Sequence, residues 1–362
     1  MKVLHCINSP HIGGIERLVI ELAIAQKKEG IEVSIMLDTR KGQYYEYLLN
    51  QDIPLLDSGI KGGFDMSRTT FKNLKAIFNT FLIIHLHSFS PIRSMAAKAS
   101  NAKVIYTMHG LSKGIRKENV IKYTVREALK KYGLNNVDYF VANSNSTLSK
   151  AKLHYGLKKK KKAVILNGVP ILSYAPDANG NNNKEFTIGL VSRFTPRKRI
   201  DRLLNAFYLF LKEGQNGRLI LVGDGVNFSE IKQLIQTLKL TNHVDLVGYS
   251  NDVDTYYRQF HVCVQPSDNE GFGLVAVEAY LYGLPILAFN DSGGLKEVIE
   301  PLEPENIVNS EAELAERLLW CSKHKTQISK DSSKRIAYAQ SNFSIERMER
   351  DYYNTYKTLM VI

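Results

Sequence analysis

Two glutamates frame the part of the sequence that carries the most chemical information. Glu270 stands directly before a Gly-Phe-Gly turn, and Glu278 follows after seven intervening residues, in an apolar stretch that ends at Gly283. Residues 261–267 are apolar enough for a buried strand, and residues 273–283 carry apolar side chains at helical spacing. The turn therefore leads from the carboxyl end of a strand into a helix.

The start of this predicted helix indicates a site for an anion. Unpaired amides and the positive end of the helix dipole meet there, and Gly271 and Gly273 let the backbone approach a phosphate closely. If the whole interval were helical, the two glutamates would lie about 12 Å apart, whereas the paired carboxylates of a glycosidase lie within about 5–10 Å. We therefore expect each glutamate to contact a different end of one long ligand.

The elements that must position these residues alternate along the whole chain. Strand and helix signals follow one another from residues 2–8 to 162–169, stop at a Gly/Asn-rich break at 177–185, and begin again at 186–192. The composition, 44% hydrophobic and 23% charged over 362 residues, is typical of a soluble globular protein with two average domains. The sequence thus predicts two doubly wound α/β sheets with a boundary near 168–186, although the break could also be a surface loop of one large domain.

Charge is divided unevenly between the two halves. Residues 1–167 contain 27 Lys and Arg against 12 Asp and Glu, a net charge of +15, while the rest of the chain has a net charge of −3. Such asymmetry indicates an anionic partner of the first half, whether a membrane surface, a phosphate-bearing substrate or nucleic acid. The three cysteines, Cys6, Cys263 and Cys321, stand in apolar surroundings, so we expect reduced, buried thiols.

No stretch of the sequence has the length and apolar character of a signal-peptide core or a membrane span. We therefore expect a cytoplasmic protein.

The stretch around Glu270 resembles the E-x7-E signature of retaining glycosyltransferase family 4, whose members have the GT-B fold. Further landmarks of the family occur in order over almost the whole chain: GGIER after the first strand, TMHG near residue 109, NGV at 167–169, SRFTPRKRID at 192–201, VGDG at 222–225, GYSNDV at 248–253, GGLKEVI at 293–299 and NFSIERM at 342–348. Each motif alone is weak, but their ordered occurrence is specific.

The resemblance implies an α/β GT-B fold in which two Rossmann-like domains face a central cleft. An acceptor-binding domain would span residues 1–167, joined by a crossover helix at 344–362, and a nucleotide-sugar-binding domain would span 168–343. In the family the first glutamate contacts hydroxyls of the donor sugar, the second contacts the ribose, and the amides after the turn hold the diphosphate. The implied donor-site residues are Glu270, Gly271, Phe272, Gly273, Leu274 and Glu278.

Two basic residues match the pair that the family places over the diphosphate, Arg193 and Lys198. Fixed cations suit this position because negative charge develops on the leaving diphosphate as the glycosidic bond breaks. The alternative is that both side chains only solvate a helix start. The family's usual glycine after the lysine is Arg199 here, which puts the shape of this loop in question.

The first half contributes three further candidates by resemblance. Gly13 and Gly14 resemble the flexible loop that approaches the phosphate, and His109 resembles the histidine near the sugar and the acceptor, although a lone histidine at a strand end is often structural. The resemblance thus implies four catalytic residues, which are His109, Arg193, Lys198 and Glu270.

No metal or cofactor is expected. His85 and His87 have the spacing of one strand face, but no carboxylate or third histidine stands nearby at a ligand spacing. Asp252 and Asp254 spell the D-x-D pattern of metal-dependent glycosyltransferases, yet they precede a helix, whose start short acidic residues stabilise. The absence of G-x-G-x-x-G in the first unit counts against a dehydrogenase.

A basic amphipathic helix is predicted at 118–132, and five lysines follow at 158–162. In the helix, apolar and basic residues both recur every four positions: Ile121, Val125 and Leu129, and Lys122, Arg126 and Lys130. We expect peripheral contact with an anionic membrane at the inner face of the plasma membrane; an ordinary surface helix and a solvated loop are the alternatives.

These features together predict an enzyme. It would transfer a sugar from a nucleotide diphosphate sugar, expected to be a UDP-sugar, to a hydroxyl of a glycan or lipid-linked acceptor with retention at the anomeric carbon. The expected setting is cell-surface polysaccharide synthesis, with no nucleic-acid partner. Two alternatives stay open, a GT-B nucleotide-sugar epimerase and a non-catalytic regulatory subunit that binds a nucleotide sugar.

Overall fold

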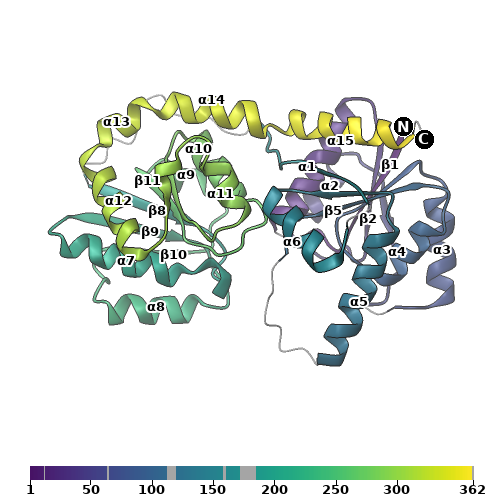
Figure 1. The fold of residues 1–362 in the computed structure, drawn as a ribbon, viewed down its shortest axis with the longest axis horizontal. Coiled ribbons are helices and arrows are strands. Elements are labelled where there is room, and N and C mark those ends of the chain that lie inside the picture. The colour runs from purple at the N-terminus through teal and green to yellow at the C-terminus, as the bar shows by residue number, and fades with distance from the viewer. Residues whose placement is uncertain (12, 63–64, 112–119, 158–159, 172–184, 361–362) are drawn as a thin grey trace. The chain divides into compact units, whose positions relative to one another are not determined.

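A computed structural model describes residues 1–11, 13–62, 65–111, 120–157, 160–171 and 185–360, without the side chains of residues 120–122. The chain divides into two compact units. Unit 1 comprises Met1–Pro170 and Ile345–Ile362, and unit 2 comprises Ile171–Ser344. Figure 1 shows the ribbon of both.

Unit 1 is built on a seven-stranded sheet in the order β3-β2-β1-β4-β5-β6-β7, in which every neighbouring pair is parallel. Its strands are β1 (Lys2–Ile7), β2 (Glu32–Leu37), β3 (Leu55–Asp57), β4 (Ile83–Leu86), β5 (Lys103–Met108), β6 (Tyr139–Ala142) and β7 (Lys161–Val164). The central strands are nearly continuous apolar runs because helices cover both faces of the sheet.

Alternate residues of these strands enter two different cores. The helices of unit 1 are α1 (Gly14–Lys28), α2 (Tyr45–Leu49), α3 (Arg68–Phe78), α4 (Pro91–Lys98), α5 (Val120–Asn136), α6 (Asn145–Tyr155) and α15 (Ile345–Met360). Val3 and Ile7 pack with α1 and α15, while Leu4 and Cys6 pack with α3, α4 and α6 on the opposite face. The last helix of the chain, α15, packs against the first, α1 (Figure 1).

Unit 2 is a six-stranded parallel sheet in the order β10-β9-β8-β11-β12-β13. Its strands are β8 (Phe186–Val191), β9 (Gly217–Val222), β10 (Val244–Gly248), β11 (Val262–Gln265), β12 (Ile286–Phe289) and β13 (Ile307–Val308). Its helices are η2 (Pro196–Lys198), α7 (Ile200–Lys212), α8 (Phe228–Thr237), α9 (Asp254–Tyr257), α10 (Leu274–Leu281), α11 (Gly294–Ile299), η3 (Pro304–Asn306), α12 (Glu311–Lys323), α13 (Lys325–Lys330) and α14 (Ser332–Phe343).

The strand order confirms the predicted α/β fold, and it locates the ligand-binding edge of each sheet. The order reverses between β1 and β4 in unit 1 and between β8 and β11 in unit 2. Ligands of doubly wound sheets bind beyond the carboxyl ends of the strands at such a reversal. In unit 2 this edge carries the residues that follow β8 and β11, and in unit 1 it carries those that follow β1 and β4.

Three details differ from the sequence prediction. The strands β3 and β13 were not predicted, because three and two residues are too short to show periodicity. The strand expected at 162–169 is β7, which ends at Val164. The chain leaves the sheet there because it turns toward α15, where Ile345 N donates to Val169 O at 2.9 Å.

Two expectations about the chain as a whole can be compared with the structure. Cys6, Cys263 and Cys321 are free and buried, as predicted. Among the described residues, no helix combines the length and the apolar character that crossing a membrane requires.

Candidate functional site

The backbone of Glu270 is fixed by the loop that precedes α11. Glu270 forms a parallel bridge with Gly293, in which Glu270 N donates to Ser292 O and Gly294 N donates to Glu270 O, both at 2.9 Å. Gly293 has φ +70°, and a Cβ there would lie 2.7 Å from Glu270 O. The motif GGLKEVI therefore contributes a close backbone contact that holds the glutamate.

The turn after Glu270 ends where α10 begins, at Leu274. Gly273 precedes the helix with φ +96°, and Phe272 is buried against Phe343 with ring centroids 5.7 Å apart. The first amides of α10 have no partner within the helix. Because the interval between the glutamates is helical only from Leu274 onward, the spacing of about 12 Å calculated for a continuous helix does not apply.

The Glu270 carboxylate lies between two cations. Its Oε1 is 2.5 Å from Lys198 Nζ, and its Oε2 is 3.4 Å from Arg197 Nη1. Burial alone would raise the pKa of Glu270, but the charges of Lys198 and Arg197 outweigh it and hold the pKa below its usual range. Burial also lowers the pKa of Lys198, against the attraction of Glu270. At neutral pH this is an ion pair with an ionised carboxylate.

Arg197 was not among the residues singled out from the sequence. It stands next to Lys198 in η2, and its Nη1 also donates to Asn269 O at 3.2 Å. The only available signal was its place in the run SRFTPRKRID, where three other basic residues compete for the same role. The structure therefore adds Arg197 to the residues that surround Glu270.

Arg199 keeps the loop shape that a glycine would favour. It adopts the left-handed conformation, with φ +48° and ψ +43°, between the end of η2 and the start of α7. Its guanidinium binds the Asp201 carboxylate at 2.8 Å. Arg193 is exposed after β8 and, within the part of the chain that the structure describes, forms no ion pair; its charge helps to lower the Lys198 pKa.

Glu278 lies on α10 in a different environment. Its Oε2 accepts a hydrogen bond from the Tyr257 hydroxyl at 3.1 Å, and Tyr257 stacks on Tyr282 with centroids 4.9 Å apart. The two glutamates therefore have separate partners, a pair of cations for Glu270 and a tyrosine for Glu278.

The carboxylates of the D-x-D pattern are used locally. Asp252 accepts from Thr255 N at 3.2 Å and from Thr255 Oγ1 at 2.5 Å, at the start of α9. The Tyr282 hydroxyl donates to Asp254. These contacts match the interpretation of Asp252 as a residue that stabilises a helix start.

In unit 1 the candidate glycines lie where α1 begins. Gly13 precedes the helix and its carbonyl accepts from Arg17 N at 3.1 Å; Gly14 is the first helical residue. A Cβ at Gly13 would lie 2.2 Å from a carboxylate oxygen of Glu16, which occupies the first turn.

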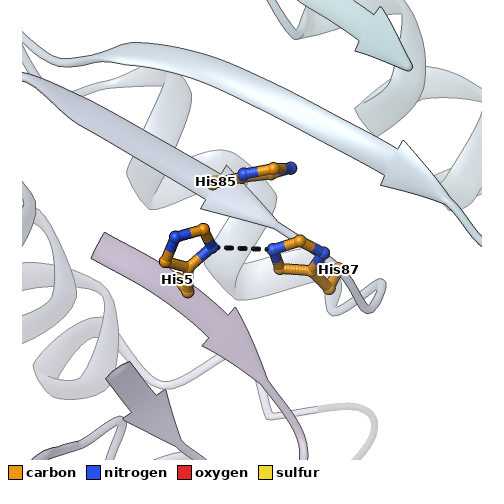
Figure 2. A group of neighbouring side chains, drawn as sticks. All are labelled: His5, His85 and His87. Atoms are coloured by element: carbon orange, nitrogen blue, oxygen red, sulfur yellow. Dashed lines mark hydrogen bonds between the residues drawn. The ribbon is translucent and has the colours of Figure 1, made fainter. Parts of the chain in front are cut away.

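His109 follows β5, is half-buried, and is hydrogen-bonded to one of three buried histidines. Figure 2 shows these three, His5 from β1, His85 from β4 and His87 just after β4. No third histidine was expected near His85 and His87, but in the structure His5 lies beside them, with one nitrogen of each ring within 4.8 Å of the others. The parallel pairing of β1 with β4 sets His5 directly opposite His85.

Hydrogen bonds connect these rings to one another and to their surroundings. His5 Nδ1 lies 2.9 Å from His87 Nε2 (Figure 2), and His87 Nδ1 lies 3.1 Å from His109 Nε2. Burial lowers the pKa of His5 and of His109 to about 4, and it lowers the pKa of His85 and His87 well below the usual value. All four imidazoles are therefore neutral at pH 7.

The basic surface predicted in unit 1 is less available than the sequence suggested. Lys130 packs over the Tyr155 ring at 5.4 Å, and burial lowers its pKa. Lys160 donates to Val137 O at 2.9 Å, and Lys162 donates to Leu157 O at 3.2 Å. Residues 118–119 and 158–159, and the side chains of Ile121 and Lys122, lie outside the described residues.

Two doubly wound parallel sheets, with a glutamate–lysine pair at the reversal point of the second, define a glycosyltransferase of the GT-B fold. The chain matches the sequence profile described as Glycosyltransferase Family 4 over residues 12–171 and that described as Glycosyl transferases group 1 over residues 175–341. It belongs to this family of retaining glycosyltransferases.

Relatives and solved structures agree with this assignment. An uncharacterized 41.2 kDa protein from the cps region of Klebsiella pneumoniae is 31% identical over 66% of this chain and 68% of its own length. The capsular polysaccharide biosynthesis glycosyltransferase CapM of Staphylococcus aureus is 25% identical over 79% of this chain and 82% of its own. The crystal structure of Anabaena HepE in complex with UDP superposes with a TM-score of 0.83 and 21% identity, covering 99% of this chain and 100% of that one. HepE has also been solved with UDP-glucose.

Proposed function

We propose that the protein transfers a sugar from a UDP-sugar to a hydroxyl of a glycan or lipid-linked acceptor in cell-surface polysaccharide synthesis. The observation that carries this proposal is the ionised Glu270, held by Lys198 just before the glycine turn that leads into α10. A capsular polysaccharide enzyme among the relatives and the UDP and UDP-glucose complexes of HepE support the choice of setting and nucleotide.

In this proposal the residues around α10 divide the donor between them. The diphosphate binds the first amides of α10 and draws the ammonium of Lys198 from Glu270, whose carboxylate is then available to sugar hydroxyls. Arg193 and Lys198 stabilise the charge that develops on the leaving diphosphate. Glu278 binds the ribose. The bond from the anomeric carbon to the diphosphate breaks, the acceptor oxygen attacks from the same face, and its proton passes to the leaving phosphate.

Thermal unfolding with a panel of ligands in EDTA tests the donor assignment. A ligand at 100 times its Kd stabilises the folded state by about 2.7 kcal/mol, so we expect UDP-sugars to raise the Tm by several degrees and sugars linked to other nucleotides to do less. In Glu270→Gln the shift caused by UDP alone should remain, while the additional shift caused by the sugar is lost. A panel in which no UDP derivative raises the Tm would contradict the proposal.

Product analysis separates transfer from the two alternatives. An epimerase would convert the sugar of the donor without any acceptor, and a regulatory subunit would leave donor and acceptor unchanged. We expect a new glycosidic bond that has the same anomeric configuration as the donor. This bond should form only when an acceptor is present, and it should still form in EDTA. Strict dependence on Mn²⁺ or Mg²⁺ would restore Asp252 and Asp254 as candidate ligands.

The acceptor side of the proposal includes contact with a membrane at its cytoplasmic face. The described surface that favours it is apolar: a pocket of about 260 Å³ between α3, α4 and α5 is lined by Phe71, Met95, Leu129 and Tyr132, with Lys98 among its lining residues. Tyr132 is 65% exposed and Met95 41%. Exposed apolar side chains beside a lysine are suited to the boundary between headgroups and acyl chains.

A further inference from the structure

A continuous chain of hydrogen bonds leads from α1 to His109. Gln26 Oε1 lies 2.7 Å from His5 Nε2, His5 Nδ1 lies 2.9 Å from His87 Nε2, and His87 Nδ1 lies 3.1 Å from His109 Nε2. The other ring nitrogen of His109, Nδ1, is buried and has no hydrogen-bond partner in the part of the chain that the structure describes. The series of hydrogen bonds therefore begins at the Gln26 amide and ends at an unpaired nitrogen of His109.

All hydrogen bonds in this series donate in the same direction, from His109 toward Gln26. Gln26 donates through its Nε2 to the Tyr356 hydroxyl at 3.3 Å, so its Oε1 faces His5 and can only accept. A neutral imidazole has a single N–H. His5 must therefore place its proton on Nε2, accept from His87 Nε2–H, and leave His87 Nδ1 to accept from His109 Nε2–H. His109 Nδ1 then carries a lone pair.

Two other uses of the histidines fit less well. His5, His85 and His87 could hold a metal ion by distance, since their nearest nitrogens lie within 4.8 Å of one another. Zinc binds the lone pairs of ring nitrogens at about 2.0–2.1 Å. The hydrogen bond between His5 Nδ1 and His87 Nε2 needs a proton on one of these nitrogens, which is then unable to bind a metal ion. Both nitrogens of His85 are engaged as well, by Tyr356 and Thr107 at 2.7 Å each.

A proton relay is disfavoured for a different reason. A relay needs a group at its inner end that takes up or releases a proton, and the amide of Gln26 does neither. A fixed direction without proton exchange suits a positioning role, like that of the second partner that sets the tautomer of a histidine at metal sites and in catalytic triads.

We propose that Gln26, His5 and His87 are positioning residues that hold His109 in the tautomer with Nε2 protonated, so that Nδ1 accepts a hydrogen bond from a sugar hydroxyl. The ligand class rests on the proposed function, whereas the tautomer follows from the geometry of unit 1 alone. A buried acceptor without a donor is unfavourable, and a sugar hydroxyl supplies the donor that His109 lacks in the described structure.

The tautomer is measured directly by two-bond ¹H–¹⁵N spectra of the full chain labelled at histidine, which distinguish a protonated ring nitrogen from one with a lone pair. We expect His109 Nδ1 to be unprotonated in the wild type. In Gln26→Met, which removes the acceptor, His109 should populate the Nδ1–H form. Thr107→Val is the matched control, because it removes a buried hydrogen bond of His85 and leaves the chain from Gln26 to His109 intact.

Transfer kinetics add a second readout. We expect Gln26→Met to lower kcat/KM about tenfold or more, the effect of losing one hydrogen bond to the substrate. Among donor and acceptor analogues that each lack one hydroxyl, the loss should disappear for the analogue without the hydroxyl that His109 binds.

Several results would overturn the proposal. These are Nδ1–H on His109 in the wild type, the same tautomer in Gln26→Met as in the wild type, and stoichiometric zinc in the purified protein with shifted signals of His5, His85 and His87. The wild-type spectrum tests the proposal by itself if Gln26→Met does not fold. If the spectra show the expected tautomers but no sugar transfer is detected, the positioning role would be supported and the proposed function would be contradicted.

Discussion

Lys198 has two charged partners in the proposed reaction, the Glu270 carboxylate before the donor binds and the diphosphate afterwards. Lys198→Met should lower kcat by about 100-fold or more, because it removes one preorganised charge at the developing anion. It should also destabilise unit 2, since Glu270 is 8% exposed and would lose its closest cation. Steady-state kinetics and urea unfolding measure the two effects.

Arg218→Ala provides the comparison for this variant. Arg218 binds Asp245 with two nitrogens in the same unit, but the pair is exposed and involves none of the residues around Glu270. We expect nearly unchanged kinetics and a stability change below about 1 kcal/mol, as is usual for surface ion pairs. If Lys198→Met turned over at the rate of Arg218→Ala, the role assigned to Lys198 would have to be abandoned.

Residues of the candidate site could be predicted where the pattern that marks them lies within a short stretch of sequence. Glu270 stands beside a glycine turn at a helix start, a pattern that is complete within a few residues, and the ordered family motifs added Lys198. His5 could not be assigned, because its relation to His87 arises from the pairing of β1 with β4, some 80 positions apart in the sequence. Strand order and register decide such contacts.

At the scale of elements, the bridge between Glu270 and Gly293 can be tested by adding one methyl group. Gly293→Ala places a Cβ 2.7 Å from Glu270 O and forces a side chain into a backbone conformation with φ +70° and ψ −124°. We expect a stability loss of about 1–3 kcal/mol together with at least a tenfold loss of kcat/KM, because Glu270 must move. Unfolding and transfer assays on the same preparation measure both.

Gly214→Ala separates backbone strain from displacement of the glutamate. Gly214 follows α7 with φ +72°, close to the φ of Gly293, but a Cβ there meets no atom within 4 Å. Its substitution should cost about 1–2 kcal/mol of backbone strain and leave activity unchanged. Equal losses of activity in both variants would indicate that Gly293 acts only through stability.

The elements themselves followed from hydrophobic periodicity wherever they were long. The strands of both sheet centres and the helix after Glu270 lie where the sequence placed them, because apolar runs and a closing glycine are local signals. The short edge strands β3 and β13 form only because a neighbouring strand offers hydrogen bonds. The left-handed Arg199 shows the limit of residue preference, since the loop keeps this conformation with a side chain that usually avoids it.

At the scale of the whole molecule, the two units should differ in their response to acid. Burial lowers the pKa values of four histidines in unit 1, to about 4 for His5 and His109, so the folded state takes up fewer protons than the unfolded state. Their contribution to stability is therefore complete above the unfolded pKa of about 6.5 and is lost as the pH falls toward 4, by up to about 1.4 kcal/mol per pH unit for each group. The lowered Glu270 pKa affects unit 2 only at lower pH, near and below the unfolded pKa of a glutamate.

The single tryptophan makes this difference measurable, because Trp320 lies on α12 of unit 2. Between pH 7.5 and 5, the urea transition seen by circular dichroism, which reports both units, should move to lower urea more than the transition seen by Trp320 emission. His324→Gln controls for the histidine that stacks on the indole at 4.4 Å. Circular dichroism transitions that do not move over this pH range would contradict the assignment of neutral buried histidines.

Contact with a membrane depends on the balance of charge and apolar surface over unit 1. The excess of basic residues suggested an electrostatic attraction, but Lys130, Lys160 and Lys162 form contacts with other residues of unit 1. On α4 and α5, the exposed side chains include the apolar Met95 and Tyr132. We therefore expect binding to vesicles that contain acidic phospholipids to be weakened by salt without being abolished, because apolar insertion is not screened.

Variants at the apolar pocket distinguish this mode of binding from a purely electrostatic one. Replacing Met95 and Tyr132 by Ser should reduce sedimentation with anionic vesicles several-fold, since each apolar side chain that leaves the interface removes burial worth about 1–2 kcal/mol. Val226→Ser is the matched control, because Val226 is an 84% exposed apolar residue of unit 2. UDP binding should stay unchanged in all of these variants. If Met95 and Tyr132 could be replaced without effect while high salt released the protein completely, the lysines would account for the binding; negligible binding of the wild type to any vesicle would favour a soluble acceptor.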